Sequence, residues 1–521
     1  MSPDGIETDV CIVGAGAAGA VIAAELATRG IDVTVLESGP RYPLAQRAEA
    51  QRRFLRNLHP FPSPDPGLDR YTVDSTLPFR LEWMRMRGIG GSTLHWEGYA
   101  MRFHPDDFAL RSRHGIADDW PLSYAELEPF YGRAERALGV AGAETDPEFA
   151  RSTAFPLPAF PPSYSDGVFA RACGELGIDV LPIPQARNSE PYGGRPACLA
   201  CGTCYACPIG ARASVDLTHV PRAEATGYAR FVADAHVLRL EAEADGRIVS
   251  ALYRTRDGGE GRVHARRFVL AGGTIENVRL CLLSASRSHP DGLANASGLL
   301  GANFMCHPVV DFTGGVAEPL YPYRTGFSSS MTRDWAARGE RERRSGFWIE
   351  FRNRAGGSPG TVALHAGVWG RGLRARVRAD FGKRAGMRVF LEALPDRGNR
   401  ITLDRGQTDT YGSPVPHLRF AIGGYERGGL AAASKAVRSI YGAMRATDIS
   451  ESSIMLASHL MGAHRMGADP ATSVVDATQR AHGHPNLWLA GGGSFVTSSW
   501  ANPTLTIVAL AIRTADALAA A

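Results

Sequence analysis

The sequence predicts an α/β protein in which a Rossmann-like dinucleotide-binding domain is interleaved with an α+β lobe. Four observations near the N-terminus predict the first domain. An apolar run at 9–13 is typical of a buried parallel strand, and an alanine-rich run at 17–28 is typical of a helix. A glycine-rich turn joins them, and a second, alternating strand at 31–36 ends at Glu37, 18 residues after Gly19.

The glycine-rich turn contains Gly14, Gly16 and Gly19, and each of these glycines suits a dinucleotide site. A pyrophosphate binds at a helix N-terminus, where unpaired amides and the helix dipole favour negative charge, and glycine lets the backbone come close. A downstream acid, here Glu37, holds the ribose hydroxyls. Such a turn can match by chance, but the strand, helix, second strand and acid are all in place. The unit predicts a bound dinucleotide without separating FAD from NAD.

The rest of the chain gives the outline of further elements. A strand is predicted at 266–271 before a helix at 275–284, and a long apolar helix is predicted at 503–520. The middle of the chain alternates basic loops with strand-like runs, of which 346–351 and 388–393 are the clearest. Strands and helices therefore continue through both predicted lobes.

The composition fits a globular protein with at least one substantial core. The chain has 521 residues, of which 44% are hydrophobic and 21% charged. The net charge of +4 is spread along the chain, so nucleic acid is not an expected partner. No apolar stretch reaches the roughly 18 residues of a membrane span, and the first nine residues are acidic where a signal peptide would be basic. We therefore expect a cytoplasmic protein without a membrane span.

Four further motifs are distributed over most of the chain. They are GIGGSTLHW at 88–96, HLMGAHRMG at 459–467, HPNLWLAGG at 484–492 and ANPTLT at 501–506. Their residues and order resemble the glucose-methanol-choline (GMC) oxidoreductases, flavoproteins that oxidise alcohols, and most closely the sugar oxidases and dehydrogenases similar to pyranose oxidase. The resemblance implies an FAD-binding domain of the glutathione-reductase type. It therefore favours FAD as the cofactor.

The resemblance implies catalytic roles for His459 and Asn502, which lie 43 positions apart as in the family. His459 would take the alcohol proton as the carbinol hydride leaves for the flavin N5, and an imidazole suits this role because its pKa lies near the working pH. Asn502 would hydrogen-bond the substrate oxygen. A single histidine in an apolar run is usually a satisfied core residue, but the paired motifs favour catalysis. His464 is expected to be structural.

The resemblance also implies which residues contact the flavin. Gly91, Ser92 and Thr93 should lie against the isoalloxazine, and His95 matches the histidine that pyranose oxidases join covalently to it. Covalent and non-covalent attachment both stay open. The complete set of expected cofactor-binding residues is Gly14, Gly16, Gly19, Glu37, Gly91, Ser92, His95, Gly492, Pro503 and Thr504.

Four cysteines, Cys198, Cys201, Cys204 and Cys207, are each separated by two residues, and a proline follows the last. Thiolates at this density gather around an iron-sulfur cluster or zinc, and the pattern approaches the ferredoxin run with its last spacing one residue short. The resemblance adds that several GMC sugar dehydrogenases carry an iron-sulfur cluster in the corresponding region, with a spacing that can differ from the one here. The alternative is that the thiols are structural. An iron-sulfur cluster is therefore one of two open expectations.

The resemblance divides the chain between two lobes. The FAD domain is expected from 1–45, 80–105, 205–310 and 455–521, the substrate-binding lobe from 106–204 and 311–454, and a loop or lid, rich in proline and arginine, from 46–79.

The implied reaction is FAD-dependent oxidation of an alcohol group of a carbohydrate or sugar-containing natural product, with oxygen or another electron acceptor. Oxidases that convert a hydroxymethyl group of an aminoglycoside antibiotic to an aldehyde also resemble this group, so such an intermediate, and antibiotic biosynthesis, are part of the expectation. Two alternatives remain at this point. One is an enzyme similar to hydroxynitrile lyases, which keep FAD without redox turnover, and the other is a sugar dehydrogenase that passes electrons through an iron-sulfur cluster.

Overall fold

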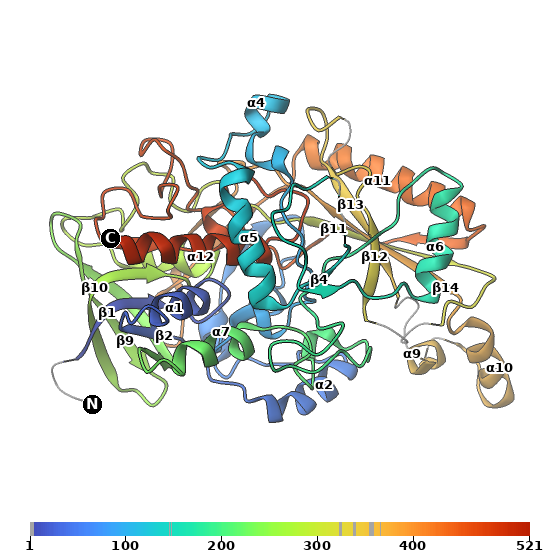
Figure 1. Ribbon diagram of the computed structural model, residues 1–521, viewed down its shortest axis with the longest axis horizontal. Coiled ribbons are helices and arrows are strands. Elements are labelled where there is room, and N and C mark those ends of the chain that lie inside the picture. Colours follow the sequence, from blue (N-terminus) through green and yellow to red (C-terminus); the bar gives the residue numbers. More distant parts are fainter. Residues whose placement is uncertain are drawn as a thin grey trace.

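The computed structural model describes residues 5–144, 146, 148–321, 326–336, 340–353, 359–364 and 366–521. Residues 1–4, the start of the acidic segment used to predict location, lie outside this part. Figure 1 shows two sheets side by side, each covered by helices, with the C-terminal end of the chain near the first sheet. None of the helices in the described ranges has both the length and the apolar character needed to cross a membrane.

The first sheet contains the predicted Rossmann-like unit. Its strand order is β7-β2-β1-β10-β9-β8, and β19 also pairs with β10. The strands are β1 (Ile6–Val13), β2 (Val33–Leu36), β7 (Ala229–Val232), β8 (Ala235–Ala242), β9 (Ile248–Thr255), β10 (Glu260–Leu270) and β19 (Leu487–Leu489). β7, β2, β1, β10 and β19 run parallel, and β8 and β9 continue the sheet as antiparallel strands. The strands predicted at 9–13, 31–36 and 266–271 are confirmed as β1, β2 and the end of β10.

Helices cover the parallel part of the first sheet because its strands are apolar on both faces. Val10, Cys11 and Ile12 of β1 are fully buried. Helix α1 (Gly19–Ala27) packs against α7 (Val215–Glu224) and α12 (Thr504–Ala520), and α12 packs against α5 (Tyr124–Leu138). The helices predicted at 17–28, 275–284 and 503–520 are confirmed as α1, α8 (Thr274–Leu283) and α12.

The second sheet is antiparallel and has the strand order β17-β11-β14-β13-β12-β6, with β18 beside β11. Its strands are β6 (Leu181–Pro182), β11 (Pro308–Gly315), β12 (Ser328–Thr332), β13 (Phe347–Arg352), β14 (Arg384–Leu391), β17 (Thr447–Glu451) and β18 (Met455–Leu456). The predictions at 346–351 and 388–393 are confirmed as β13 and β14, although β14 ends at Leu391. Helices α6 (Tyr164–Gly174) and α11 (Gly424–Ala443) pack together on one face of this sheet.

Segment 46–79, predicted to be a loop or lid, has more regular structure than its composition suggests. It contains α2 (Arg47–Leu55) and β3 (Thr72–Ser75), and β3 pairs with β16 (Pro414–Phe420), which in turn pairs with β15 (Arg400–Thr408). Only Arg47 and Ala50 of α2 are buried. A helix with so small a buried face needs no apolar stripe, and its sequence therefore shows little apolar periodicity. Whether this segment moves as a lid stays a prediction, as does the division of the chain between the two lobes.

The remaining elements are short or peripheral. They are α3 (Leu81–Met84), α4 (Leu110–His114), β4 (Ala141–Gly142), β5 (Leu157–Pro158), α9 (Pro359–Leu364) and α10 (Gly370–Asp380).

Replacing Gly19 with alanine tests the packing at the start of α1. A Cβ atom at Gly19 would lie 1.9 Å from the carbonyl oxygen of Gly14, so either the helix or the turn must move. We expect Gly19→Ala to lower the free energy of unfolding by about 2 kcal/mol, a typical cost of overpacking, and to lower the melting temperature in a thermal scan. Gly167→Ala is the matched control, because a Cβ at this position in α6 meets nothing within 4 Å. Equal melting temperatures for the two variants would contradict the packing argument.

Candidate active site

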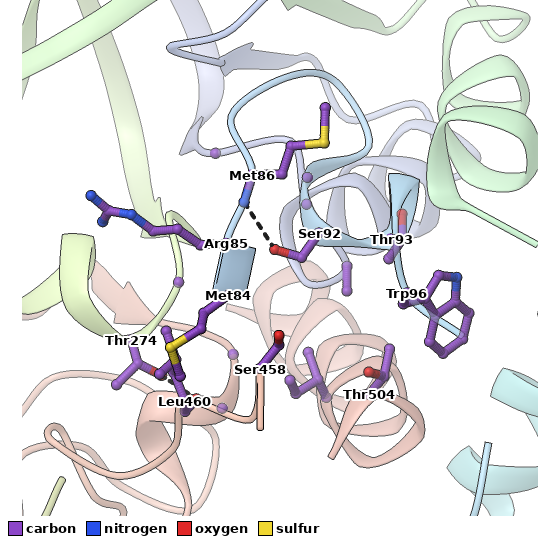
Figure 2. A pocket seen from close by; sticks show the side chains of 18 of the residues that line it. Met84, Arg85, Met86, Ser92, Thr93, Trp96, Thr274, Ser458, Leu460 and Thr504 are labelled. Atoms are coloured by element: carbon purple, nitrogen blue, oxygen red, sulfur yellow. Dashed lines mark hydrogen bonds between the residues drawn. The ribbon is translucent and has the colours of Figure 1, made fainter. Parts of the chain in front are cut away.

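One cavity, about 430 Å³ in volume, brings together almost all of the predicted catalytic and cofactor-binding residues. The predicted residues that line it are Gly14, Gly16, Glu37, Gly91, Ser92, His95, His459, Gly492, Asn502, Pro503 and Thr504. Gly19 does not line the cavity, since it packs beneath the turn against Gly14. Figure 2 shows side chains from distant parts of the sequence meeting at the cavity, including Ser92, Thr274, Ser458 and Thr504.

Two glycine-rich loops pack closely at one end of the cavity. Gly14 has a φ of +103°, and a Cβ there would lie 2.6 Å from the carbonyl oxygen of Ala271. Gly91 has a φ of +51°, and a Cβ there would lie 2.8 Å from the Cα of Gly16. No side chain of the described residues caps the N-terminus of α1. This end of the cavity therefore has open backbone and a helix N-terminus, which suit a phosphate group.

Glu37 joins these two loops through its carboxylate. Oε2 accepts a hydrogen bond from the backbone N–H of Ala15, and Oε1 accepts from those of Gly39 and Gly88, each at 2.9 Å. Burial raises the pKa of Glu37, and the three amides and then Arg87 act in the opposite direction. The sequence predicted that this acid would hold ribose hydroxyls. In the structure the carboxylate also fixes the shape of the glycine-rich turn, and its ribose role stays a prediction.

The segment 91–95 lies along the cavity wall. Ser92 Oγ accepts a hydrogen bond from the backbone N–H of Met86 at 3.3 Å (Figure 2). The hydroxyl of Thr93 donates to the carbonyl oxygen of Gly90 and accepts from the backbone N–H of Val215, so Thr93 has a structural role. His95 is 6% exposed, and its buried Nδ1 has no hydrogen-bond partner in the described part of the chain. Burial lowers the pKa of His95 to about 3, so the ring is neutral.

His459 and Asn502 meet at the other end of the cavity. Asn502 Nδ2 lies 3.1 Å from His459 Nε2, and His459 Nδ1 lies 3.0 Å from Nδ1 of His307. The ring of Phe390 stacks on that of His459, with 5.8 Å between their centroids. His307 lies behind His459, is fully buried, and has its Nε2 3.3 Å from the carbonyl oxygen of Ser498. Residues far apart in the sequence thus form a chain of hydrogen bonds that reaches the cavity.

The four clustered cysteines are outside this cavity, and the structure does not support a cluster there. Cys198 is partly buried, Cys201 is exposed, and Cys204 and Cys207 are buried; all four are free thiols. Within the described residues, no three or more histidine, cysteine or acidic side chains are arranged to hold a metal ion. Arg187 lies 3.9 Å from Cys204, and Thr203 lies 3.0 Å from Cys201. The expectation of an iron-sulfur site is therefore not supported.

Sequence reasoning missed three groups at the site. His307 lies outside the four motifs that indicated the family, in a segment at 298–308 that also resembles the family but gives His307 no role. Glu97 directly follows the motif at 88–96, so its position was the available signal. Arg388 was part of a predicted strand, and nothing in the sequence indicated that its side chain faces the cavity.

The N- and C-terminal domain models of the GMC oxidoreductases match residues 9–309 and 395–511 of this chain. The fold and the cavity define an FAD-dependent oxidoreductase that acts on alcohols. The chain belongs to the GMC oxidoreductase family.

Individual relatives agree with this family over nearly the whole chain. The chain is 33% identical to the fructose dehydrogenase large subunit of Gluconobacter japonicus, over 99% of each chain. It is 30% identical to the 6'''-hydroxyparomomycin C oxidase of Streptomyces lividus, over 98% of this chain and 91% of that one. The fold is similar to that of pyridoxine 4-oxidase from Mesorbium loti, with a TM-score of 0.68, 18% identity and coverage of 98% and 99%.

The residues present fit FAD. Gly14 and Gly16 line the cavity next to the N-terminus of α1, which no side chain of the described residues caps. His95 Nδ1 and Asn502 Oδ1 are buried polar atoms of the cavity wall without partners among the described residues, so a bound group can satisfy them. Gly14, Gly16 and Glu37 would hold the ADP part of FAD, and Ser92, His95 and Thr504 its isoalloxazine ring.

Replacing Glu37 with glutamine tests how the two loops are joined. A glutamine has one acceptor oxygen, and its amide nitrogen would face a backbone N–H that now donates to a carboxylate oxygen. We expect a loss of about 2 kcal/mol in the free energy of unfolding, together with weaker FAD retention on gel filtration. Glu49→Gln, on the exposed side of α2, is the control and should behave as the wild type. Full FAD retention and stability in Glu37→Gln would show that the joining bonds are dispensable.

Proposed function

We propose that this protein oxidises an alcohol group of a carbohydrate or a sugar-containing natural product to a carbonyl, with His459 as the base and Asn502 as the group that binds the substrate oxygen. The single observation that carries the proposal is the pairing of these side chains in the cavity wall, with His459 Nε2 3.1 Å from Asn502 Nδ2. The family membership and the relatives, named for fructose and hydroxyparomomycin, support the substrate class.

The hydrogen bonds of His307 decide which nitrogen of His459 can act as the base. A carbonyl oxygen only accepts, so Nε2 of His307 must donate its proton to Ser498. Nδ1 of His307 is then the acceptor, and Nδ1–H of His459 donates to it. This leaves the lone pair of His459 on Nε2, the atom that faces Asn502. His307 is thus a positioning residue for His459.

The charge state of His459 also suits a base. Burial lowers its pKa well below the usual 6.5, and the neighbouring His307 and Arg388 lower it further. Burial lowers the pKa of His307 to about 4. Both rings are therefore neutral at pH 7, and His459 Nε2 can accept a proton there.

FAD, when bound, supplies the acceptor for the hydride of the alcohol carbon. His459 Nε2 takes the hydroxyl proton, and the hydrogen bond that His459 Nδ1–H donates to His307 Nδ1 stabilises the resulting positive charge. Asn502 Nδ2, which donates to His459 in the structure, turns its donor to the substrate oxygen. Phe390, stacked on the His459 ring, limits the access of water to it.

An aminoglycoside intermediate, whose hydroxymethyl group becomes an aldehyde in antibiotic biosynthesis, is the finer form of the proposal. It is supported by the similarity to a hydroxyparomomycin oxidase.

Oxygen or another electron acceptor is the proposed second substrate, which would take up the electrons of the reaction. An iron-sulfur relay is not part of the proposal, because the four cysteines show no metal arrangement. The cytoplasmic location remains a prediction.

Replacing His459 with alanine tests the proposed base. We expect His459→Ala to keep its FAD, seen as an unchanged flavin absorption band, while anaerobic reduction of the flavin by sugars or aminoglycosides slows by about 10²- to 10⁴-fold. His264→Ala, on β10 and outside the cavity wall, is the control. Normal reduction in His459→Ala would remove the base from the proposal. A wild-type flavin that no alcohol bleaches would instead favour the lyase.

The lowered pKa of His459 predicts the pH dependence of the reaction. The neutral ring is the active form, and a depressed pKa keeps it neutral to a lower pH. We expect the rate constant of flavin reduction at saturating substrate to stay level from pH 8 down to 6.5 and to fall only at lower pH, as measured by anaerobic stopped flow. A half-maximal rate at or above pH 6.5 would contradict the neutral, buried base.

A further inference from the structure

The second sheet presents a row of charged side chains toward the cavity. Asp311 on β11 pairs with Arg388 on β14, and Arg388 pairs with Glu350 on β13. Neighbouring residues of a strand point to opposite faces, and the adjacent Val310, Ile349 and Val389 belong to the core beneath α11. The charged row Asp311–Arg388–Glu350 therefore lies on the opposite face, where Arg388 lines the cavity.

An apolar row runs beside the charged row, two residues along each strand. It consists of Val309, Phe390 and Trp348, which pair with one another across the same strands. Phe390 stacks on His459, so the apolar row adjoins the proposed base. Same-face neighbours on a strand are about 6.6 Å apart, a spacing on the scale of one monosaccharide ring. A sugar whose reacting carbinol lies at His459 would therefore place its opposite end near the charged row.

The members of the charged row have hydrogen-bond partners within the row or on neighbouring elements. Asp311 accepts two hydrogen bonds from Arg388, at 2.6 and 2.7 Å. Glu350 is fully buried and accepts from the hydroxyl of Tyr99 at 2.8 Å and from Ser328. Its second oxygen, Oε2, is buried without a partner among the described residues, but Glu350 does not line the cavity, so the row offers a ligand there little hydrogen-bonding capacity.

Glu97 is the exception next to this row. It lines the cavity, and its Oε1 accepts from the hydroxyl of Tyr205 at 2.7 Å. This bond uses only one of the two carboxylate oxygens of Glu97. Burial raises the pKa of Glu97, and the charge of Glu350 raises it further, whereas Arg352 and Arg388 lower it.

The charges around Glu97 leave one carboxylate unbalanced. Asp311, Glu350 and Glu97 are three carboxyl groups, while Arg352 and Arg388 are only two guanidinium groups, so one carboxyl has no cation of its own. Glu97 is partly exposed to the cavity. An acceptor that a ligand shields from water without bringing a donor is costly, so this carboxylate favours a ligand that brings one.

We propose that Glu97 is a specificity-determining residue that accepts a hydrogen bond from a second polar group of the substrate, a hydroxyl or an ammonium group, while the carbinol lies beside His459. This inference rests on the proposed function and adds a substrate requirement to it. Sugars and amino sugars meet the requirement, and alcohols with a single polar group do not.

Two substitutions of Glu97 separate its acceptor role from its charge. Glu97→Met removes the acceptor at similar length, and Glu97→Gln keeps an acceptor oxygen without the charge. Glu49→Gln on α2, whose carboxylate bonds Arg52 on the surface, is the control. The probes for the holoenzyme are D-glucose, D-glucosamine and 1-propanol, with kcat/KM measured for each.

The quantity compared is the kcat/KM for each sugar divided by the kcat/KM for 1-propanol, called here the D-glucose ratio and the D-glucosamine ratio. We expect Glu97→Met to lower both ratios by about 10- to 100-fold, the range for hydrogen bonds to charged groups. If the bound group is a hydroxyl, Glu97→Gln retains most of the D-glucose ratio. If it is an ammonium group, Glu97→Gln loses the D-glucosamine ratio as fully as Glu97→Met does. Either pattern supports the proposal.

A binding measurement in the His459→Ala background gives a readout independent of turnover. The dissociation constants of D-glucose and D-glucosamine, followed by perturbation of the oxidised flavin spectrum, should rise about 10- to 100-fold when Glu97→Met is added. Unchanged ratios and unchanged dissociation constants, in an enzyme whose flavin is still bleached by sugars, would overturn the role of Glu97 alone. A wild-type flavin bleached by no alcohol would overturn the proposed function, and this inference with it.

Discussion

The close approach of two glycine-rich loops is the constraint on which the rest of the site depends. Gly14 and Gly91 have backbone conformations and neighbours that exclude a side chain, and the carboxylate of Glu37 ties the backbone of both loops together. The parallel strands bring the first loop to the sheet edge, and the second loop carries Ser92 and His95 along the same cavity. An error of even 1 Å at this junction would therefore displace both ends of the cofactor site.

A buried ionic network lies behind His307, on the side away from the cavity. Ser499 donates to Asp107, which also binds Arg341, and Arg341 binds Glu392, and all four are buried. Ser498, the partner of His307, also binds the backbone of Ala393, next to this network. The orientation of His307, and through it the lone pair of His459, therefore depends on packing well outside the cavity.

The first sheet and its glycine turn could be predicted from sequence because their signals are local. An apolar run, three glycines and an acid within about 30 residues report directly on β1, α1 and β2. His459 and Asn502 were found through motifs that resemble a family, since their contact spans 43 positions. Helix α2 lacked an apolar stripe, and Glu97 and Arg388 meet only through the tertiary fold. For the four cysteines the sequence predicted too much, because their regular spacing did not bring the thiols into a metal site.

The alternation of side chains along β13 and β14 separates two tasks within one pair of strands. Odd positions such as Ile349 and Val389 build the core under α11, while Glu350, Arg388 and Phe390 face the cavity. Substitutions at the cavity-facing positions can change which molecules fit without removing apolar surface from that core. Such a sheet allows the substrate range of a lineage to diverge while its stability is maintained, because selection for fit and selection for folding act on different residues.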